Sequence, residues 1–268
     1  MNNKIGFIGA GNMAKAMIGG IVKSKLVEPN NVFASDLNIA SLESAKAEYN
    51  INITNDSKEV VKNSDVVIVA VKPNVYDLVL EGVKELIDNK KIIVTIAAGK
   101  TIESVENVIG ADKKIVRTMP NTPALVNEGM SALCKNKNIT DEELNMVKEI
   151  FNSFGKAEVV NEYLIDAVIG ASGSAPAYVF MFIEAMADAV VCAGMPRKQA
   201  YTFASQAVMG SAKMVLETGT HPGELKDMVC SPGGTTIEAV KTLEAEGFRS
   251  SVIKAIHDCI EKSKEMSK

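Results

Sequence analysis

The chain has 268 residues, of which 47% are hydrophobic, and its formal net charge is −4. This composition indicates a globular protein with one large or two ordinary domains. Acidic and basic residues are interspersed, so no basic block predicts a nucleic-acid or membrane partner. The start "MNNKIGFIGAG" leads directly into a strand pattern, and we recognise no signal peptide in it. The four cysteines form no CxxC pair and there are two histidines, so we expect reduced thiols, a cytoplasmic location and no metal site.

Short runs rich in Val and Ile alternate with helical patterns through the first 160 residues. The runs predict strands that are buried on both faces, at 4–9, 31–35, 65–71, 91–97 and 114–119. Helical patterns lie between them, at 12–24, 38–49, 74–88 and 101–108. Two further strands, 129–135 and 157–160, bracket a helix that a capping box of Thr140 and Glu143 is expected to open. Residues 1–160 are therefore predicted to form a Rossmann-type, doubly wound α/β domain that binds a dinucleotide.

Residues 161–268 show no further strand pattern and predict an all-α domain. We expect helices at 163–171, 175–193, 196–218, 222–230, 235–246 and 248–266. Several of these helices are apolar on nearly every face, which predicts burial against a second copy of the chain. The alternative is a compact helical cap on a monomer. The stretch 175–194 is apolar enough to raise the question of a membrane span, but Glu184 and Asp188 favour a buried helix of a soluble protein.

A glycine-rich loop follows the first strand. Gly9-x-Gly11-x-x-Ala14 lies where a strand ends and a helix begins, which is the context of a dinucleotide-binding fingerprint. Gly9 is expected to make the tight turn, and Gly11 is expected to let the backbone approach the pyrophosphate. The helix N-terminus offers free N–H groups to the same anion. The predicted contacts in this loop are Ile8, Gly9, Ala10, Gly11, Asn12 and Met13.

The second strand ends at Ser35 and Asp36, beside the expected position of the adenosine ribose. A carboxylate there accepts hydrogen bonds from the 2′-hydroxyl and repels a 2′-phosphate, so Asp36 favours NADH over NADPH. The competing role is that Asp36 caps the helix that follows. Ligands of such sheets bind at the carboxyl ends of the strands, so two further segments are expected to line the cleft. They are Ala70, Val71, Lys72 and Pro73, and Ala97, Ala98 and Gly99.

An unusual turn, "CSPGGTT", precedes the predicted helix 235–246. A small carboxylate is well held by a helix N-terminus, and Gly233 and Gly234 leave the backbone open to it. Pro232 stiffens the turn and Ser231 offers a hydroxyl. The alternative is an ordinary helix start capped by Ser231 or by a threonine.

Taken together, "FIGAGNMA", "AVKP", "AAG", "MPNTP", "SGSAPAYVF" and "LKDMVCSPGGTTIEAV" resemble the pyrroline-5-carboxylate reductase family over essentially the whole chain. The resemblance implies reduction of 1-pyrroline-5-carboxylate to L-proline by NADPH or NADH, the last step of proline biosynthesis. It also implies a homodimer with intertwined helical domains that is often assembled further into a decamer.

The resemblance assigns roles to single residues as well. Ser231, Gly234, Thr235 and Thr236 correspond to the substrate carboxylate site, and Thr236 also lies near the reacting ring nitrogen. Glu162 corresponds to a substrate-facing acid, and Ser57 stands where related chains often carry Asn against the cofactor ribose. Asp36 differs from the small or basic residues of members that use NADPH strongly.

Two other functions are alternatives to this one. A β-hydroxyacid dehydrogenase shares the domain types but uses a lysine after a glycine-rich segment near position 170, and residues 170–194 contain no lysine. A non-catalytic dinucleotide sensor would have no need of the turn from Ser231 to Thr236. Proline-dependent reduction of NAD(P) separates all three.

Overall fold

The structure, a computed structural model, describes residues 1–266, which form two compact units. The first unit contains Met1–Ser174 together with the end of the last helix from Ile260, and the second contains Ala175–Cys259. The contacts thus divide the chain near residue 174. The domain boundary at residue 160 stays a prediction.

The first unit is built on an eight-stranded sheet with the order β3-β2-β1-β4-β5-β6-β7-β8. Its strands are β1 (Ile5–Ile8), β2 (Val32–Ser35), β3 (Asn52–Thr54), β4 (Val66–Val69), β5 (Ile92–Thr95), β6 (Lys114–Met119), β7 (Gly129–Lys135) and β8 (Gly155–Val159). Every pair of neighbours is parallel except β6 and β7. The first six strands have the doubly wound Rossmann order, which confirms the predicted fold class.

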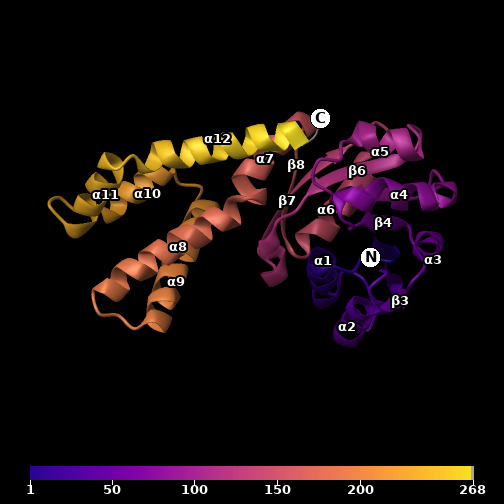
Figure 1. The fold of residues 1–268 in the computed structure, drawn as a ribbon, viewed down its shortest axis with the longest axis horizontal. Helices are drawn as coiled ribbons and strands as arrows, with labels where there is room; N and C mark the ends of the chain where they lie inside the picture. Colours follow the sequence, from indigo (N-terminus) through magenta and orange to yellow (C-terminus); the bar gives the residue numbers. More distant parts are fainter. Residues whose placement is uncertain (267–268) are drawn as a thin grey trace. The chain divides into compact units, whose positions relative to one another are not determined.

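Helices cover both faces of this sheet (Figure 1). They are α1 (Asn12–Lys23), α2 (Ile39–Tyr49), α3 (Ser57–Asn63), α4 (Pro73–Val83), α5 (Ile102–Ile109), α6 (Asp141–Asn152), α7 (Ile165–Val168) and the π-helix η5 (Ile169–Gly173). Four 3₁₀ turns complete the unit: η1 (Pro29–Asn31), η2 (Lys84–Leu86), η3 (Thr122–Val126) and η4 (Glu162–Leu164). The capping box of Thr140 and Glu143 opens α6 as predicted.

The central strands are buried on both sides, which explains their continuous apolar runs. In β4, Val66 and Ile68 belong to one hydrophobic core, while Val67 and Val69 belong to the core on the opposite face. Successive side chains of a strand point to opposite faces, so a strand covered by helices on both sides has no polar position. By contrast, β3 is a three-residue edge strand with no fully buried residue, and neither β3 nor α3 was predicted from the sequence.

The second unit is all-helical, as predicted. It contains α8 (Ala175–Cys192), α9 (Arg197–Thr218), α10 (Pro222–Val229), α11 (Thr235–Ala245) and most of α12 (Phe248–Met266). Helices α8 and α9 run side by side as an antiparallel pair (Figure 1). Helix α9 ends at Gly219, which adopts the left-handed conformation with φ 65° that glycine tolerates.

Many large apolar side chains of this unit are exposed in the single chain. Phe180, Met181 and Phe203 are 63%, 70% and 64% exposed. Apolar patches of this extent mark interfaces with other molecules.

The run Glu162–Cys192 is also long and apolar enough to cross a membrane, by length and composition only. Helices that soluble proteins bury pass the same test.

Candidate functional site

The glycine loop after β1 has the backbone geometry of a dinucleotide cradle. Gly9 has φ +104°, and a Cβ there would lie 2.6 Å from the carbonyl oxygen of Ala70. A Cβ on Gly11 would meet nothing within 4 Å, so the backbone of Gly11 faces open space. Gly11 is also the N-cap of α1 and offers no side chain to its free N–H groups. A pyrophosphate can therefore approach this loop and the helix N-terminus directly.

A cavity of about 430 Å³, here called the β2-side cavity, lies at the carboxyl ends of β1, β2 and β4. Its lining is Ile8, Gly9, Gly11, Ser35, Asp36, Leu37, Asn55, Ser57, Ala70, Val71, Lys72, Val75, Leu78 and Val79. A second cavity of about 340 Å³, here called the β5-side cavity, is lined by Gly11, Asn12, Met13, Ala70, Val71, Lys72, Pro73, Ile96, Ala97, Ala98 and Pro120. Gly11 and the segment 70–72 line both cavities, which therefore adjoin each other.

Asp36 connects the glycine loop with the end of β2. Its Oδ2 accepts a hydrogen bond from the backbone N–H of Ala10 at 2.7 Å, and its Oδ1 accepts one from the N–H of Asn38 at 2.8 Å. The N-cap of α2 is Asn38, whose side chain accepts a hydrogen bond from Ser41 N. Asp36 is therefore not the N-cap of α2, and it remains only partly buried at the wall of the β2-side cavity.

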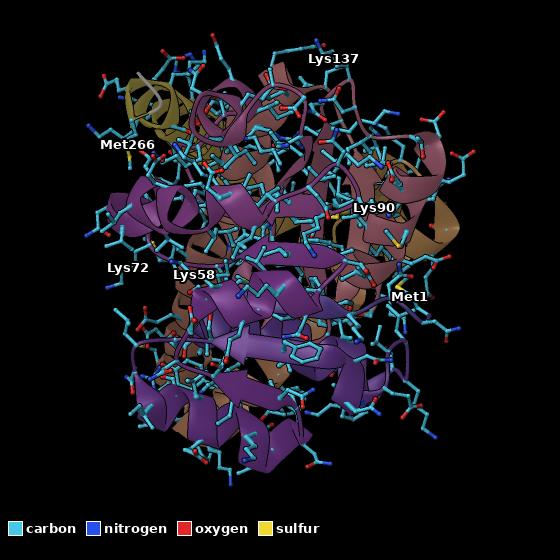
Figure 2. All side chains as sticks on the ribbon, turned by 90° about the vertical axis from the view of Figure 1, so that its right-hand side faces the viewer. Met1, Lys58, Lys72, Lys90, Lys137 and Met266 are labelled. Carbon is cyan, nitrogen blue, oxygen red and sulfur yellow. The ribbon has the colours of Figure 1, made fainter. Side chains whose placement is uncertain are left out.

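Two serines lie beside Asp36 in the same cavity. The hydroxyl oxygens of Ser35 and Ser57 are 3.1 Å apart and share a hydrogen bond across the ends of β2 and α3. The exposed Lys72 is the N-cap residue of α4, and Figure 2 shows it at the periphery of the view. Among the described residues that line the β2-side cavity, Lys72 carries the one positively charged side chain.

Two of the predicted cofactor residues lie outside both linings. The backbone N–H of Ala10 donates a hydrogen bond to Asp36 instead. Gly99 follows the lining residue Ala98 in the chain and has a positive φ of +77°. The other predicted cofactor residues each line at least one of the two cavities.

Sequence reasoning missed several residues of these linings. They are Leu37, Asn55, Val75, Leu78, Val79, Ile96 and Pro120. A signal was present for some of them. Leu37 and Leu78 are 95% and 76% exposed, and Val75, Leu78 and Val79 recur at helical spacing on one face of α4. An exposed apolar stripe on a helix next to a ligand loop indicates a surface that an apolar ring can cover.

The turn before α11 has the open backbone that an anion site requires. Gly233 has φ +67°, and a Cβ on Gly234 would lie 2.4 Å from the hydroxyl oxygen of Ser231. Gly234 is the N-cap of α11, and no side chain accepts a hydrogen bond at this cap. Ser231 and Thr235 are exposed, while Thr236 is half-buried. The first N–H groups of α11 thus lack a side-chain cap, and neither Ser231 nor a threonine caps the helix.

Glu162 has protein partners in the first unit. Its Oε1 accepts hydrogen bonds from Nη1 of Arg117 and from the backbone N–H of Ile102, both at 2.8 Å. The Arg117 side chain is only 6% exposed, whereas Glu162 is 34% exposed. Glu162 therefore neutralises a buried cation and satisfies a donor at the start of α5. It belongs to neither cavity lining.

Two family models match the chain. The model for pyrroline-5-carboxylate reductase dimerisation matches residues 162–266, and the model described as NADP oxidoreductase coenzyme F420-dependent matches residues 4–99. The first match identifies the helical part of the chain as a dimerisation domain, in agreement with its exposed apolar faces.

Relatives match over the full length. The pyrroline-5-carboxylate reductase of Escherichia coli (strain K12) is 52% identical over 268 residues, covering 100% of both chains. Among solved structures, the enzyme from Coxiella burnetii has a TM-score of 0.95 at 33% identity and covers 100% of both chains. The enzyme from Plasmodium falciparum, solved with NADP bound, has a TM-score of 0.89 at 34% identity and covers 100% of this chain and 99% of its own.

The cradle at Gly11, the two adjoining cavities and the open turn at Gly234 agree with these full-length matches. The chain therefore belongs to the pyrroline-5-carboxylate reductase family and is an NAD(P)H-dependent oxidoreductase that acts on a C=N bond in the last step of proline biosynthesis.

Proposed function

We propose that this chain reduces 1-pyrroline-5-carboxylate to L-proline in the cytoplasm, and that it uses NADH at least as well as NADPH. The observation that carries this cofactor preference is the Asp36 carboxylate at the wall of the β2-side cavity. The relatives' names leave the preference open, since one solved relative holds NADP.

The residues fit a bound dinucleotide. Gly11 and the first turn of α1 would hold the pyrophosphate, because the backbone there is bare and its N–H groups are uncapped. Ser35, Asp36 and Ser57 would face the adenosine ribose, with Leu37 and Leu78 against the base. Met13, Ala97 and Ala98 would line the nicotinamide end in the β5-side cavity. When bound, the cofactor supplies the hydride for the reduction.

Charge at Asp36 decides between the two forms of the cofactor. A carboxylate beside a 2′-phosphate is repelled by about 1–4 kcal/mol at 4 Å, depending on the local dielectric. Lys72, the cation of this cavity, lines the β5-side cavity as well, so its charge is shared between the two parts of the site. The hydroxyls of Ser35 and Ser57 can bond a phosphate but carry no compensating charge.

The turn before α11 would bind the substrate carboxylate. Its support is the set of uncapped N–H groups at the start of an 11-residue helix, with Gly234 as N-cap. Gly234 also leaves room for the Ser231 hydroxyl, which any side chain at position 234 would displace. We assign substrate contacts to Ser231, Gly234, Thr235 and Thr236. The substrate-facing role of Glu162 stays a prediction, because its carboxylate already binds Arg117 and Ile102.

The chemistry requires little of the protein beyond binding and orientation. A pyrroline nitrogen is far more basic than a carbonyl oxygen, so the substrate can arrive with its nitrogen protonated. The imine carbon takes the hydride, the C=N π electrons move to nitrogen, and the nitrogen keeps its proton. The Thr236 hydroxyl would orient that nitrogen, and most of the rate would come from holding the reacting carbon close to the hydride donor.

The exposed apolar side chains support a stable dimer. Phe180, Met181 and Phe203 project from α8 and α9, so a second copy of the chain is the partner that these helices require. We propose an intertwined homodimer that assembles further into a decamer of five dimers. The absence of a nucleic-acid or membrane partner is part of the same proposal.

Steady-state kinetics test the proposal. The full-length protein is assayed with 1-pyrroline-5-carboxylate and either NADH or NADPH, and in reverse with L-proline at alkaline pH. We expect turnover with both cofactors and a kcat/KM for NADH that equals or exceeds that for NADPH. Binding of NADH without turnover would instead identify a dinucleotide sensor, and a tenfold preference for NADPH would overturn the assigned role of Asp36.

A further inference from the structure

Asn121 directly follows Pro120, which lines the β5-side cavity, and its side chain bonds to two distant segments. Its Nδ2 donates a hydrogen bond to the carbonyl oxygen of Ser172 at 3.0 Å, and its Oδ1 accepts one from the backbone N–H of Met130 at 2.8 Å. The residue is only 8% exposed and lines neither cavity. One buried amide thus joins the loop after β6, the start of β7 and the π-helix η5.

The partner at Ser172 is an irregular piece of backbone. The N–H of Ser174 bonds to the carbonyl of Ile169 at 2.8 Å, which is the i to i+5 bond of a π-turn. Such turns are rare, occur mostly as single-turn insertions in α-helices, and are frequent at functional sites. Here the carbonyl oxygen of Ser172 accepts its hydrogen bond from the Asn121 side chain. A residue outside the helix therefore stabilises the π-helix η5.

Side-chain packing reinforces the same contact. A Cβ on Gly173 would lie 3.0 Å from Cε of Met119, so the absence of a side chain lets Met119, at the end of β6, pack against the π-helix. Met119 and Asn121 are the sequence neighbours of Pro120. Pro120 lines the β5-side cavity together with Ala97 and Ala98. The position of Pro120 therefore depends on a loop that is held on one side by Met119 and on the other by Asn121.

We propose that Asn121 is a positioning residue for hydride transfer, which fixes the Pro120 wall of the β5-side cavity against the π-helix. The inference rests on the proposed binding of the nicotinamide in that cavity. Asn121 is not a contact for the cofactor, so its loss should leave cofactor binding nearly unchanged. It should instead change the distance and angle between the reacting groups, to which a hydride transfer is steeply sensitive.

Asn136 provides a matched control. It is also a buried loop asparagine, 6% exposed, and its Nδ2 donates to the carbonyl oxygen of Lys113 at 2.8 Å and to Oε1 of Glu106 at 2.9 Å. Its Oδ1 accepts a hydrogen bond from the backbone N–H of Ile115, near the amino end of β6. It therefore lies at the edge of the sheet opposite the cavities. Asn136→Asp places a carboxylate beside Glu106, so it disturbs the fold at least as much as Asn121→Asp.

The experiment compares Asn121→Asp with Asn136→Asp in the full-length protein. For Asn121→Asp we expect kcat to fall by roughly 10- to 100-fold while the Kd for NADH, measured by its fluorescence, changes less than about threefold. The deuterium isotope effect on kcat, measured with 4-deuterated NADH, should rise because hydride transfer becomes more strongly rate-limiting. Asn136→Asp should keep the wild-type kcat and isotope effect even where its Tm is lower.

Asn121→Ala and Asn136→Ala repeat the comparison without an added charge, in case the aspartate variants fold poorly. The proposal is overturned if both members of a pair lose kcat equally, if only the Kd for NADH changes, or if the isotope effect stays at its wild-type value. Wild-type protein that does not reduce the imine would refute the proposed function itself, and this inference with it.

Discussion

Oδ2 of Asp36 accepts a hydrogen bond from the backbone N–H of Ala10 at 2.7 Å, so the end of β2 and the glycine loop are joined by one carboxylate. The same side chain lines the β2-side cavity. Asp36 can thus act on the cofactor in two ways, through its charge and through the loop that it holds. Substitutions can separate these two effects.

Asp36→Ser should shift the kcat/KM ratio toward NADPH by about tenfold or more, because it removes the repulsion of a 2′-phosphate. Most of the change should be in KM, since the contact is remote from hydride transfer. Asp36→Asn is the matched variant: its amide oxygen can still accept from Ala10, but the charge is gone. We expect Asp36→Asn to shift the kcat/KM ratio toward NADPH as Asp36→Ser does, but with a smaller rise in the KM for NADH. An unchanged ratio in both variants would leave Asp36 only as an anchor of the loop.

Thr236→Ala should lower kcat/KM for the imine by about 5- to 150-fold, the loss expected for one hydrogen bond of about 1–3 kcal/mol to the reacting ring. Thr236→Ser should recover much of the activity. The control is Thr242→Ala on the same helix, where the hydroxyl donates a hydrogen bond to the carbonyl oxygen of Glu238 at 3.1 Å. Wild-type kinetics in Thr236→Ala would refute its assignment as the catalytic hydroxyl.

Glu162→Gln should reduce the free energy of unfolding by about 2 kcal/mol, because it leaves the Arg117 guanidinium buried without a counter-charge. This is less than for a fully buried pair, since the Glu162 side chain is 34% exposed. Urea unfolding measures the loss. The KM for the imine tests the predicted substrate contact separately: a rise in KM at saturating NADH supports it, and an unchanged KM restricts Glu162 to its structural role.

Full-length protein should sediment as a dimer or larger species and never as a stable monomer of 28.6 kDa. The reason is the exposed apolar surface of α8 and α9, to which Phe203 contributes at 64% exposure. Phe203→Asp should weaken assembly and expose this surface, whereas Lys137→Asp in the first unit should not (Figure 2). A folded wild-type monomer in dilute solution would contradict the proposed interface.

Cys134 should make the protein less stable at alkaline pH. Burial raises the pKa of its thiol from 9.0 to about 11, Glu162 adds to this, and Arg117 acts in the opposite direction. Because the folded-state pKa is the higher one, its contribution to stability is fully present below pH 9 and is lost as the pH rises from about 9 to about 11. Cys134→Ala should therefore show a shallower fall of unfolding free energy in that window. An identical slope would mean that the thiol is not protected by the fold.

Local patterns in the sequence were sufficient for most of the fold. Continuous Val and Ile runs predicted strands covered on both faces, and the two cores that divide the side chains of β4 give the reason. The caps at Thr140 and Gly219 act through neighbouring residues, so they too can be read from the sequence. The edge strand β3 was missed because it is short and half-exposed, and a strand without a buried face has no hydrophobic period.

The amino-acid sequence by itself determined the order of the buried strands and most helices, the glycine loop after β1 and the glycine turn before α11, since each depends on residues that are adjacent in the chain. Only the tertiary structure decided that Asp36 binds Ala10, that Glu162 binds Arg117, and that Asn121 holds the carbonyl of Ser172. These partners are 26, 45 and 51 residues apart, and the local sequence around a side chain does not indicate which distant group it will contact. That pairing follows from the fold of the sheet, which brings the carboxyl ends of β1, β2 and β6 to one edge.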